Sequence, residues 1–197
     1  MTPKIGVLAL QGDFAAHVAA LDREGIGSVE VRYAAQLDLL DGLIVPGGES
    51  TTLLRLIADL GLWAPLRAFH ARGGAVFGTC AGAILIAREV FAPKQPSLDF
   101  LDIDVERNAY GRQRESFEVD GPAPAFGEVP LPMVFIRAPR IVRVGAGVEV
   151  LASHRGEPVL VRRGAVMAGT FHPEMTADGR VHRHFASIAA SRGAAAS

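Results

Sequence analysis

The sequence predicts an α/β fold whose central sheet is mostly parallel in the first half of the chain and gains antiparallel strands in the second. Up to about residue 90, short apolar runs alternate with segments of helical spacing, which is typical of a parallel sheet covered on both faces. From residue 101 onward, short β-like runs are separated by Gly and Pro before one final helix. At 197 residues, with 49% hydrophobic and 21% charged residues, we expect one globular domain spanning residues 1–197.

The first half supplies the alternating elements. Residues 5–10 form a continuous apolar run, as expected for a strand covered on both faces. Phe14, Val18 and Leu21 have helical spacing, and Gly25 ends the helix predicted over residues 14–24. We expect further strands over residues 29–31, 43–45 and 75–77, and helices over residues 51–60, 64–71 and 81–87.

The second half predicts a meander of strands followed by a helix. The β-like runs cover residues 101–106, 116–119, 133–136, 148–152, 159–162 and 166–171. Residues 121–132 are rich in Pro and predict a loop, and the last helix is expected over residues 180–191. The Ala-rich end, residues 192–197, is expected to be frayed.

Charge and cysteine content exclude several classes of protein. A formal net charge of −1 gives no broad electrostatic basis for binding nucleic acid or an anionic membrane. The longest apolar run is well under the roughly 18 residues of a membrane span. A single cysteine forms neither an internal disulfide nor a cysteine-based zinc site, so we expect a reducing, cytoplasmic setting.

The one cysteine, Cys80, lies in the pattern Gly-x-Cys-x-Gly between a predicted strand and a predicted helix. This is the arrangement of a nucleophile elbow, in which a sharp turn presents the reactive side chain and the Ala81 N–H points to where an oxyanion can form. A free cysteine is also among the most buried residue types, so the pattern alone leaves a core thiol equally open.

A nucleophilic cysteine needs a base, and His172 is the best candidate among six histidines. It ends a predicted strand, because Pro173 favours an extended backbone before it, and Glu174 follows close enough to orient the imidazole. A zinc deaminase motif is excluded because no cysteine follows Cys80. His182 and His184 do not share a helix face and are expected at the surface rather than on a metal.

A third candidate is the turn between the strand ending at Val45 and the next helix. Pro46, Gly47 and Gly48 are followed by Ser50 and Thr51, either of which is a good helix N-cap. Consecutive N–H groups in such a turn bind anions, although the Gly-Lys-Ser/Thr of a nucleotide P-loop is missing. Two arginines that follow or lie within β-like runs, Arg107 and Arg137, suit bidentate capture of a carboxylate, but each alone is more often a solvated surface charge.

Taken together, these motifs resemble those of class I glutamine amidotransferases of the triad type. The resemblance extends over nearly the whole chain to the glutaminase subunits of pyridoxal 5′-phosphate synthases. It is carried by IGVLALQGDFAAH, DGLIVPGGESTTL, VFGTCAGAILIA, ERNAYGRQRESFE, VFIRAPRI and FHPEMT. Many amidotransferases share the cysteine motif, whereas PGGEST, ERNAYGRQ and FIRAP in this order are much more specific.

The resemblance implies a flavodoxin-like three-layer α/β/α sandwich and glutamine hydrolysis, with ammonia passed to a partner synthase subunit in a hetero-oligomer. It implies Cys80 as nucleophile and His172 and Glu174 as the rest of the triad, with no metal or cofactor. Backbone N–H groups of Gly48 and Ala81 would hold the oxyanion. The residues expected against L-glutamine are Gly48, Glu49, Ser50, Arg107, Ile136 and Arg137.

One further residue and three alternatives complete the sequence-based predictions. Gln11 directly follows the first strand, and we hypothesise that it couples synthase docking to oxyanion-hole formation. A glutaminase subunit of another ammonia-using pathway, such as histidine biosynthesis, would have the same triad. A related cysteine hydrolase would explain the elbow but not the glutamine pocket. A non-enzymatic binding module would lack a triad residue, and none is missing here.

Overall fold

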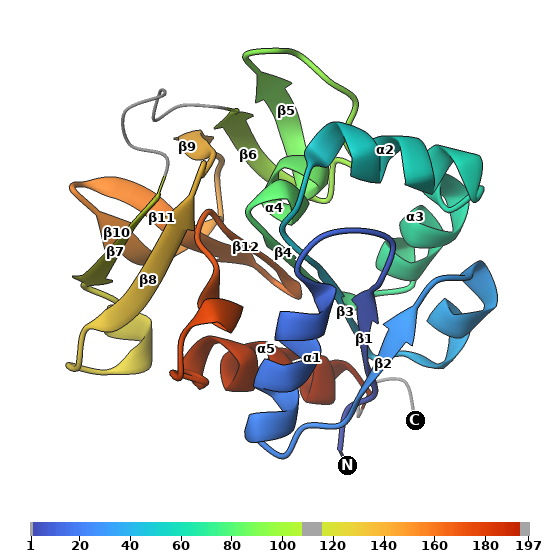
Figure 1. Cartoon of the computed structure of the whole chain (residues 1–197), viewed down its shortest axis with the longest axis horizontal. Coiled ribbons are helices and arrows are strands. Elements are labelled where there is room, and N and C mark those ends of the chain that lie inside the picture. The colour runs from blue at the N-terminus through green and yellow to red at the C-terminus, as the bar shows by residue number, and fades with distance from the viewer. Residues whose placement is uncertain (1, 108–115, 194–197) are drawn as a thin grey trace.

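A computed structural model describes residues 2–107 and 116–193, and its largest element is a seven-stranded sheet in the order β10-β11-β12-β4-β3-β1-β2 (Figure 1). Its strands are β1 Ile5–Leu8, β2 Ser28–Val31, β3 Gly42–Val45, β4 Ala75–Thr79, β10 Glu149–His154, β11 Glu157–Arg163 and β12 Val166–Gly169. Strands β2, β1, β3, β4 and β12 are mutually parallel, and β11 and β10 continue the sheet antiparallel. The predicted α/β fold with a mostly parallel central sheet is therefore confirmed.

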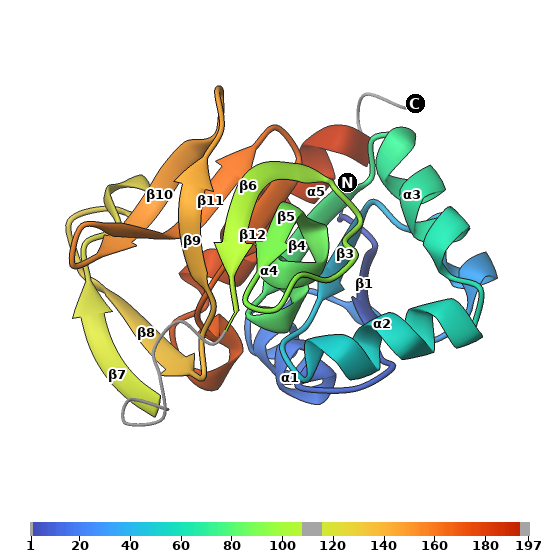
Figure 2. The same ribbon diagram turned by 90° about the horizontal axis from the view of Figure 1, so that it is seen from above.

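Helices and two small sheets cover the two faces of this sheet (Figure 2). The α-helices are α1 Phe14–Arg23, α2 Ser50–Asp59, α3 Trp63–Ala71, α4 Ala81–Ile86 and α5 Arg180–Gly193. The small sheets contain β5 Ala87–Phe91, β6 Leu101–Glu106 and β9 Arg140–Val144, and β7 Ser116–Gly121 with β8 Leu131–Ile136. Short 3₁₀ helices lie at η1 Ala34–Leu39, η2 Pro124–Phe126 and η3 Pro173–Met175.

The apolar residues of the central strands alternate between two separate cores. In β4, Val76 packs with α2, α3 and α4, whereas Ala75 and Phe77 pack on the other face with α1 and α5. In β3, Leu43 and Val45 face the first core and Ile44 the second. Both faces are thus apolar, as a parallel sheet covered on two sides requires, and the three layers match the predicted sandwich.

Several predicted boundaries were wrong. Strands β5 and β9 were not predicted, and β5 begins at Ala87, directly after α4, with no Gly or Pro to mark the change. The predicted loop over residues 121–132 is shorter, because β7 extends to Gly121, β8 begins at Leu131, and η2 lies between them. Three second-half strands join the main sheet. β12 is parallel to β4, whereas β11 is antiparallel to β12 and β10 is antiparallel to β11.

The chain ends and one motif lie partly outside the described residues. Helix α5 continues to Gly193, two residues beyond the predicted end, so the expected fraying can only concern residues 194–197, which are outside the described part. Residues 108–115 are also outside it, and they include residues 108–113 of the ERNAYGRQ motif. Within residues 2–107 and 116–193, no helix combines the length and apolarity needed to cross a membrane.

Candidate active site

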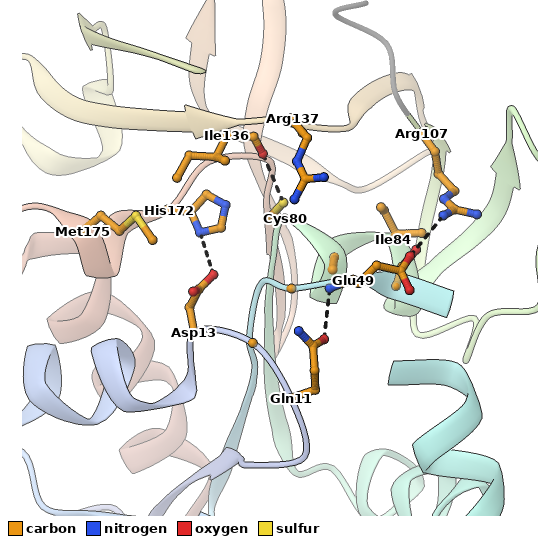
Figure 3. A pocket seen from close by; sticks show the side chains of 14 residues that line it. Gln11, Asp13, Glu49, Cys80, Ile84, Arg107, Ile136, Arg137, His172 and Met175 are labelled. Atoms are coloured by element: carbon orange, nitrogen blue, oxygen red, sulfur yellow. Dashed lines mark hydrogen bonds and ion pairs between the residues drawn. The ribbon is translucent and has the colours of Figure 1, made fainter. Parts of the chain in front are cut away.

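The candidate active site lies at the carboxyl ends of β1, β3, β4 and β12, where the loops of the four central strands meet. In parallel α/β sheets this edge is the usual place for ligands. The loops border a cavity of about 350 Å³ (Figure 3). Its lining includes Gln11, Gly48, Glu49, Ser50, Cys80, Ala81, Arg107, Ile136, Arg137 and His172. These are all the predicted site residues except Glu174, which is buried behind His172.

Cys80 is the single residue between β4 and α4, and its backbone has the geometry of an elbow. Its φ of 48° and ψ of −105° fall in a region that L-residues rarely adopt. The strained turn is held because the Cys80 N–H donates to the Gly169 carbonyl at 2.8 Å, while the Cys80 carbonyl accepts from Ile84 N–H at 3.2 Å. Strain maintained by surrounding structure is characteristic of functional sites, which favours the nucleophile over the core thiol.

The two glycines of the elbow let backbones approach closely. A Cβ on Gly82 would lie 1.9 Å from the Val45 carbonyl oxygen, and one on Gly78 would lie 2.6 Å from the Gly82 backbone. Helix α4 therefore packs directly against the end of β3 and the start of the Pro46–Ser50 turn. This contact brings the glycine turn and the cysteine elbow to one side of the cavity.

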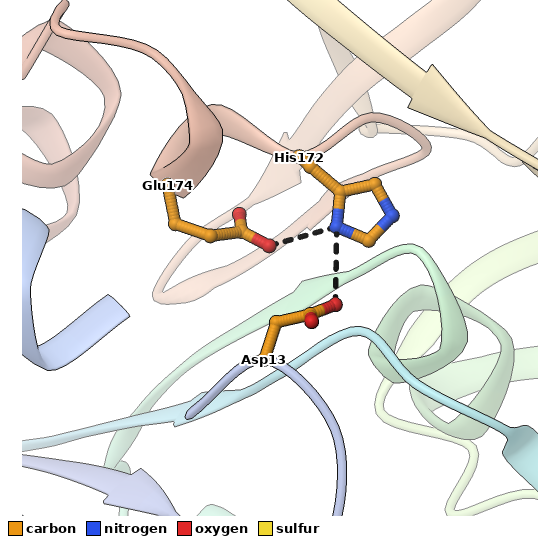
Figure 4. Close-up of side chains that lie close together, drawn as sticks. All are labelled: Asp13, His172 and Glu174. Atoms are coloured by element: carbon orange, nitrogen blue, oxygen red, sulfur yellow. Dashed lines mark hydrogen bonds and ion pairs between the residues drawn. The ribbon is translucent and has the colours of Figure 1, made fainter. Parts of the chain in front are cut away.

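His172 and Glu174 form the hydrogen-bonded pair that the sequence predicted (Figure 4). His172 Nδ1 lies 2.8 Å from Glu174 Oε1, and both side chains are almost fully buried. His172 Nε2 is buried without a hydrogen-bond partner in the described part of the chain, and Figure 3 shows the ring on the Cys80 side of the cavity. Because Nδ1 is bonded to Glu174, Nε2 is the ring nitrogen that can interact with the Cys80 sulfur.

The environment of His172 favours its charged form. Burial alone would lower its pKa, but the interactions with Cys80 and Glu174 outweigh burial and raise the pKa to about 10. Burial raises the pKa of Glu174, while its hydrogen bond to His172 opposes that change. A buried imidazolium between a sulfur and a carboxylate is the arrangement of an activated cysteine nucleophile.

Asp13 is a second carboxylate beside His172 that sequence reasoning missed. Its Oδ2 lies 3.5 Å from His172 Nδ1 (Figure 4), and its backbone N–H donates to the Gly47 carbonyl at 3.1 Å. Asp13, like Gln11, follows β1 at the carboxyl edge of the sheet, so its position in the sequence could have identified it as a candidate site residue. Asp13, His172 and Glu174 offer ligand atoms within 4.8 Å of one another, and the 2.8 Å Nδ1–Oε1 contact has the length of a hydrogen bond.

The glycine turn differs from its prediction in one respect. The N-cap of α2 is Glu49, not Ser50 or Thr51: its carboxylate accepts from the Thr51 and Thr52 N–H groups at 3.1 and 2.7 Å. The Ser50 hydroxyl instead donates to Gln95 Oε1 at 3.2 Å. A carboxylate reaches the free N–H groups of the first helical turn as well as a hydroxyl does, and it adds a favourable interaction with the helix dipole.

Glu49 also links the turn to the substrate side of the cavity. Its Oε1 lies 3.7 Å from Arg107 Nη2, and its backbone N–H donates to Gln11 Oε1 at 3.0 Å. Burial would raise the pKa of Glu49, but hydrogen bonds from Thr51 and Thr52 outweigh it and lower the pKa to about 2. The carboxylate is therefore ionised at neutral pH beside Arg107.

Ile136 and Arg137 close the cavity from β8. The Ile136 carbonyl lies 3.9 Å from the Cys80 sulfur, and Arg137 has a φ of 43°, which makes it, after Cys80, the second non-glycine residue with positive φ in the described lining of the cavity. Figure 3 shows the Arg137 side chain directed into the cavity near Cys80. Gly12, Ile84 and Met175 also line the cavity and were not predicted.

The two histidines of α5 are not both where they were expected. His182 is fully buried, not at the surface, and its Nε2 lies 3.0 Å from Nδ1 of the equally buried His17. His184 is partly buried and lies against Phe126. His182 falls on the inner face of α5 with Phe185, Ala186 and Ala189, a helical spacing that was visible in the sequence.

The three-layer α/β/α fold and a cavity that brings Cys80 and His172 together fit the class of cysteine-dependent amidohydrolases. The chain belongs to the SNO glutamine amidotransferase family, whose model matches residues 7–190. It is therefore a glutamine amidotransferase, and the alternatives of a binding module or a cysteine hydrolase acting on other electrophiles are set aside.

Individual relatives agree with this family. A protein of Thermotoga neapolitana named pyridoxal 5′-phosphate synthase subunit PdxT is 51% identical, covering 92% of this chain and 97% of its own. The subunit PdxT of Deinococcus radiodurans is 52% identical, covering 95% and 98%. A crystal structure described as a glutamine amidotransferase has 52% identity and a TM-score of 0.88, covering 94% of this chain and 98% of its own.

Proposed function

We propose that this protein is the glutaminase subunit of a pyridoxal 5′-phosphate synthase, which hydrolyses L-glutamine and passes the ammonia to a synthase subunit. The observation that carries the hydrolysis is the strained Cys80 elbow facing the buried His172–Glu174 pair across one cavity. The synthase partner is supported by relatives that are 51% and 52% identical to this chain and are named pyridoxal 5′-phosphate synthase subunit PdxT. The same relatives favour this pathway over histidine biosynthesis.

The reaction begins with the Cys80 sulfur attacking the side-chain amide carbon of glutamine. The C–S bond forms as electrons move to the amide oxygen, and the N–H groups of Gly48 and Ala81 stabilise that oxyanion. Such donors contribute about 3–4 kcal/mol in comparable sites. His172 gives its Nε2 proton to the amide nitrogen as the C–N bond breaks, which releases ammonia and leaves a glutamyl thioester.

Hydrolysis of the thioester returns the enzyme to its starting state. His172, now neutral, takes a proton from water as the water oxygen attacks the thioester carbon. The C–S bond breaks, the Cys80 thiolate is restored beside the protonated imidazole, and glutamate leaves. Throughout, Glu174 Oε1 holds the Nδ1 proton, so that Nε2 is the nitrogen that exchanges protons.

The charged residues of the cavity fit the two ends of free glutamine. Arg107 and Arg137 are guanidinium donors for its carboxylate. Ionised Glu49 holds Arg107 from the α2 side, while the backbone of Gly48, Glu49, Ser50 and Ile136 lines the path of the side chain towards Cys80. In this proposal no metal or cofactor takes part. The chain works as one domain in the cytoplasm, where a single free cysteine stays reduced.

The test is glutamate release from glutamine, with and without the synthase subunit of the same organism. The wild-type complex should release glutamate, and Cys80→Ala should lose nearly all of this activity, about 10⁶-fold in comparable triads. Co-purification with a different ammonia-accepting enzyme would assign the chain to another pathway. A wild-type chain that releases no glutamate in either condition contradicts the proposed hydrolysis.

A further inference from the structure

Behind the triad lies a second buried histidine that the reaction does not use directly. His17, on the inner face of α1, is fully buried, and its Nε2 lies 3.3 Å from Glu174 Oε2 and 3.0 Å from the Thr79 hydroxyl. On its other side, Nδ1 lies 3.0 Å from His182 Nε2 on α5. One imidazole therefore connects α1, α5, the end of β4 and the carboxylate that orients His172.

Glu174 needs a donor on its second oxygen. Oε1 is occupied by His172 Nδ1, whereas Oε2 is buried and has no hydrogen bond among residues 2–107 and 116–193. An ionised oxygen without water or a donor is unfavourable in a protein interior. The polar contact that the structure gives Oε2 is His17 Nε2, so an N–H at this position would face both Oε2 and the Thr79 oxygen.

The protonation states of the histidines select one arrangement of their protons. Burial, then the nearby His182 and His172, lower the pKa of His17 well below its usual range. Burial, then Arg23, lower the pKa of His182 to about 4. Both rings are thus neutral at pH 7, and each carries one proton.

If His17 carries its proton on Nε2, that N–H donates to Thr79 Oγ1 at 3.0 Å and places its positive end 3.3 Å from Glu174 Oε2, while Nδ1 accepts from His182 Nε2–H. The opposite tautomer would set the Nε2 lone pair against the Glu174 carboxylate. It would also leave His182 with its proton on Nδ1, which has no partner in the described part of the chain. The first arrangement satisfies every buried N–H group of the two rings.

We propose that His17, in the Nε2–H tautomer fixed by His182, is a positioning residue that holds Glu174 and through it the His172 base. It touches neither glutamine nor Cys80, because it does not line the cavity. Among the described residues, the charged or titratable groups that act on these side chains are Asp13 and His172 beside Glu174, and Arg23 and Glu24 beside His182.

The kinetic test compares His17→Phe with His17→Gln in the complex with the synthase subunit. Phe removes the donor but keeps a ring, whereas Gln returns an amide N–H near the position of Nε2. His17→Phe should lower kcat for glutamine hydrolysis about 10- to 100-fold, the usual effect of losing a partner behind a reacting group. KM for glutamine should change little, and His17→Gln should recover most of kcat.

The pH profile separates positioning from a merely structural role. With Glu174 less well held, the imidazolium of His172 is less stabilised, so the alkaline limb of kcat/KM should move to lower pH in His17→Phe. A smaller fraction of folded enzyme would lower kcat/KM equally at every pH and would leave the alkaline limb where it is. His70→Phe is the matched control: His70 is a half-buried histidine stacked on Phe100 at 4.3 Å, away from the cavity, and its replacement should leave the limb in place.

The tautomer can be measured in the wild type, independently of any variant's folding. ¹⁵N NMR of the full chain should show the His17 proton on Nε2. A proton on Nδ1, or His17→Phe with wild-type kcat and an unmoved limb, would overturn the proposal. The kinetic comparison rests on the proposed glutamine hydrolysis, and if that proposal is wrong the wild type itself will be inactive. The NMR measurement of the His17 tautomer does not depend on that activity.

Discussion

At the scale of single residues, the chemistry depends on which atoms of buried groups carry protons. Cys80 and the His172–Glu174 pair were predicted from sequence because each lies where a strand ends, beside Gly or Pro. Their joint burial was not predictable, since it depends on β12 pairing with β4, residues far apart in the chain. His17 was detectable in principle, because it lies within the helical spacing of Phe14, Val18 and Leu21.

The pKa of His172 should depend on its sulfur neighbour. In the wild type, Cys80 and Glu174 raise that pKa to about 10 against burial. In Cys80→Ala the burial remains but the sulfur is gone, so the His172 pKa should fall clearly. NMR titration of the ring measures this change, and the His70 resonance serves as internal control. A His172 pKa that stays near 10 in Cys80→Ala would refute the contribution of Cys80 to that pKa.

The Glu49 cap should contribute to stability in a pH-dependent way. Removing a side-chain N-cap costs about 1 kcal/mol, so Glu49→Ala should lower the free energy of unfolding by about that amount at pH 7. The pKa of Glu49 is about 2 in the folded protein against an ordinary value of 4.5. Its contribution is therefore present above pH 4.5 and is lost as pH falls towards 2.

Urea unfolding at pH 7 and at low pH measures this effect. Asp59→Ala is the control, because Asp59 ends the same helix in an exposed pair with Arg55 at 3.5 Å. Such surface pairs contribute about 0–1 kcal/mol, and the Asp59 change should be the smaller of the two at pH 7. Equal losses from both variants would show that the Glu49 carboxylate does not act as a cap.

At the scale of elements, the site depends on how closely α4 approaches the end of β3. The sequence predicted both elements and the turn between them, but not the distance of their backbones. That distance is set by Gly82, whose missing side chain lets the Val45 carbonyl lie where a Cβ would be. Sequence reasoning missed β5 and β9 because their partner is β6 in a separate sheet, a choice made by tertiary pairing.

Gly82→Ala should therefore disturb both stability and activity. The new Cβ would be 1.9 Å from the Val45 oxygen, so the backbone must move, at a cost of about 1–3 kcal/mol. The displaced Pro46–Ser50 turn should also lower kcat for glutamine. Gly27→Ala is the control, since a Cβ there meets nothing within 4 Å. Thermal unfolding and glutamate release measure both effects, and a Gly82 variant as stable as the control would contradict the close approach.

At the scale of the whole molecule, one edge of the sheet gathers residues from both ends of the chain. Gln11 follows β1 and binds the Glu49 N–H, so it joins the first loop to the glycine turn of the proposed oxyanion hole. The sequence placed Gln11 at this edge, but its partner could not be predicted, because strand order is a non-local property.

Gln11→Ala should weaken the response to the synthase more than the basal reaction. Without the amide, the Glu49 N–H loses its acceptor, and docking at the loop can no longer be transmitted to the turn. The expected result is a smaller ratio of glutamate release with synthase to release without it. Gln36→Ala, in η1 and outside the cavity, is the control. An unchanged ratio in Gln11→Ala would refute the coupling.

The strand order also affects how the chain folds while it is being synthesised. Strands β2, β1, β3 and β4 can pair early, but the outer neighbour of β4 is β12, which is made near the end of the chain. Until then, β4 is an unpaired edge strand whose residues are buried in the folded protein. Unpaired apolar edge strands are prone to aggregation. The nascent protein thus carries Cys80, the proposed nucleophile, next to this open edge, and the pairing of Val166–Gly169 both covers the edge and brings in His172, the proposed base.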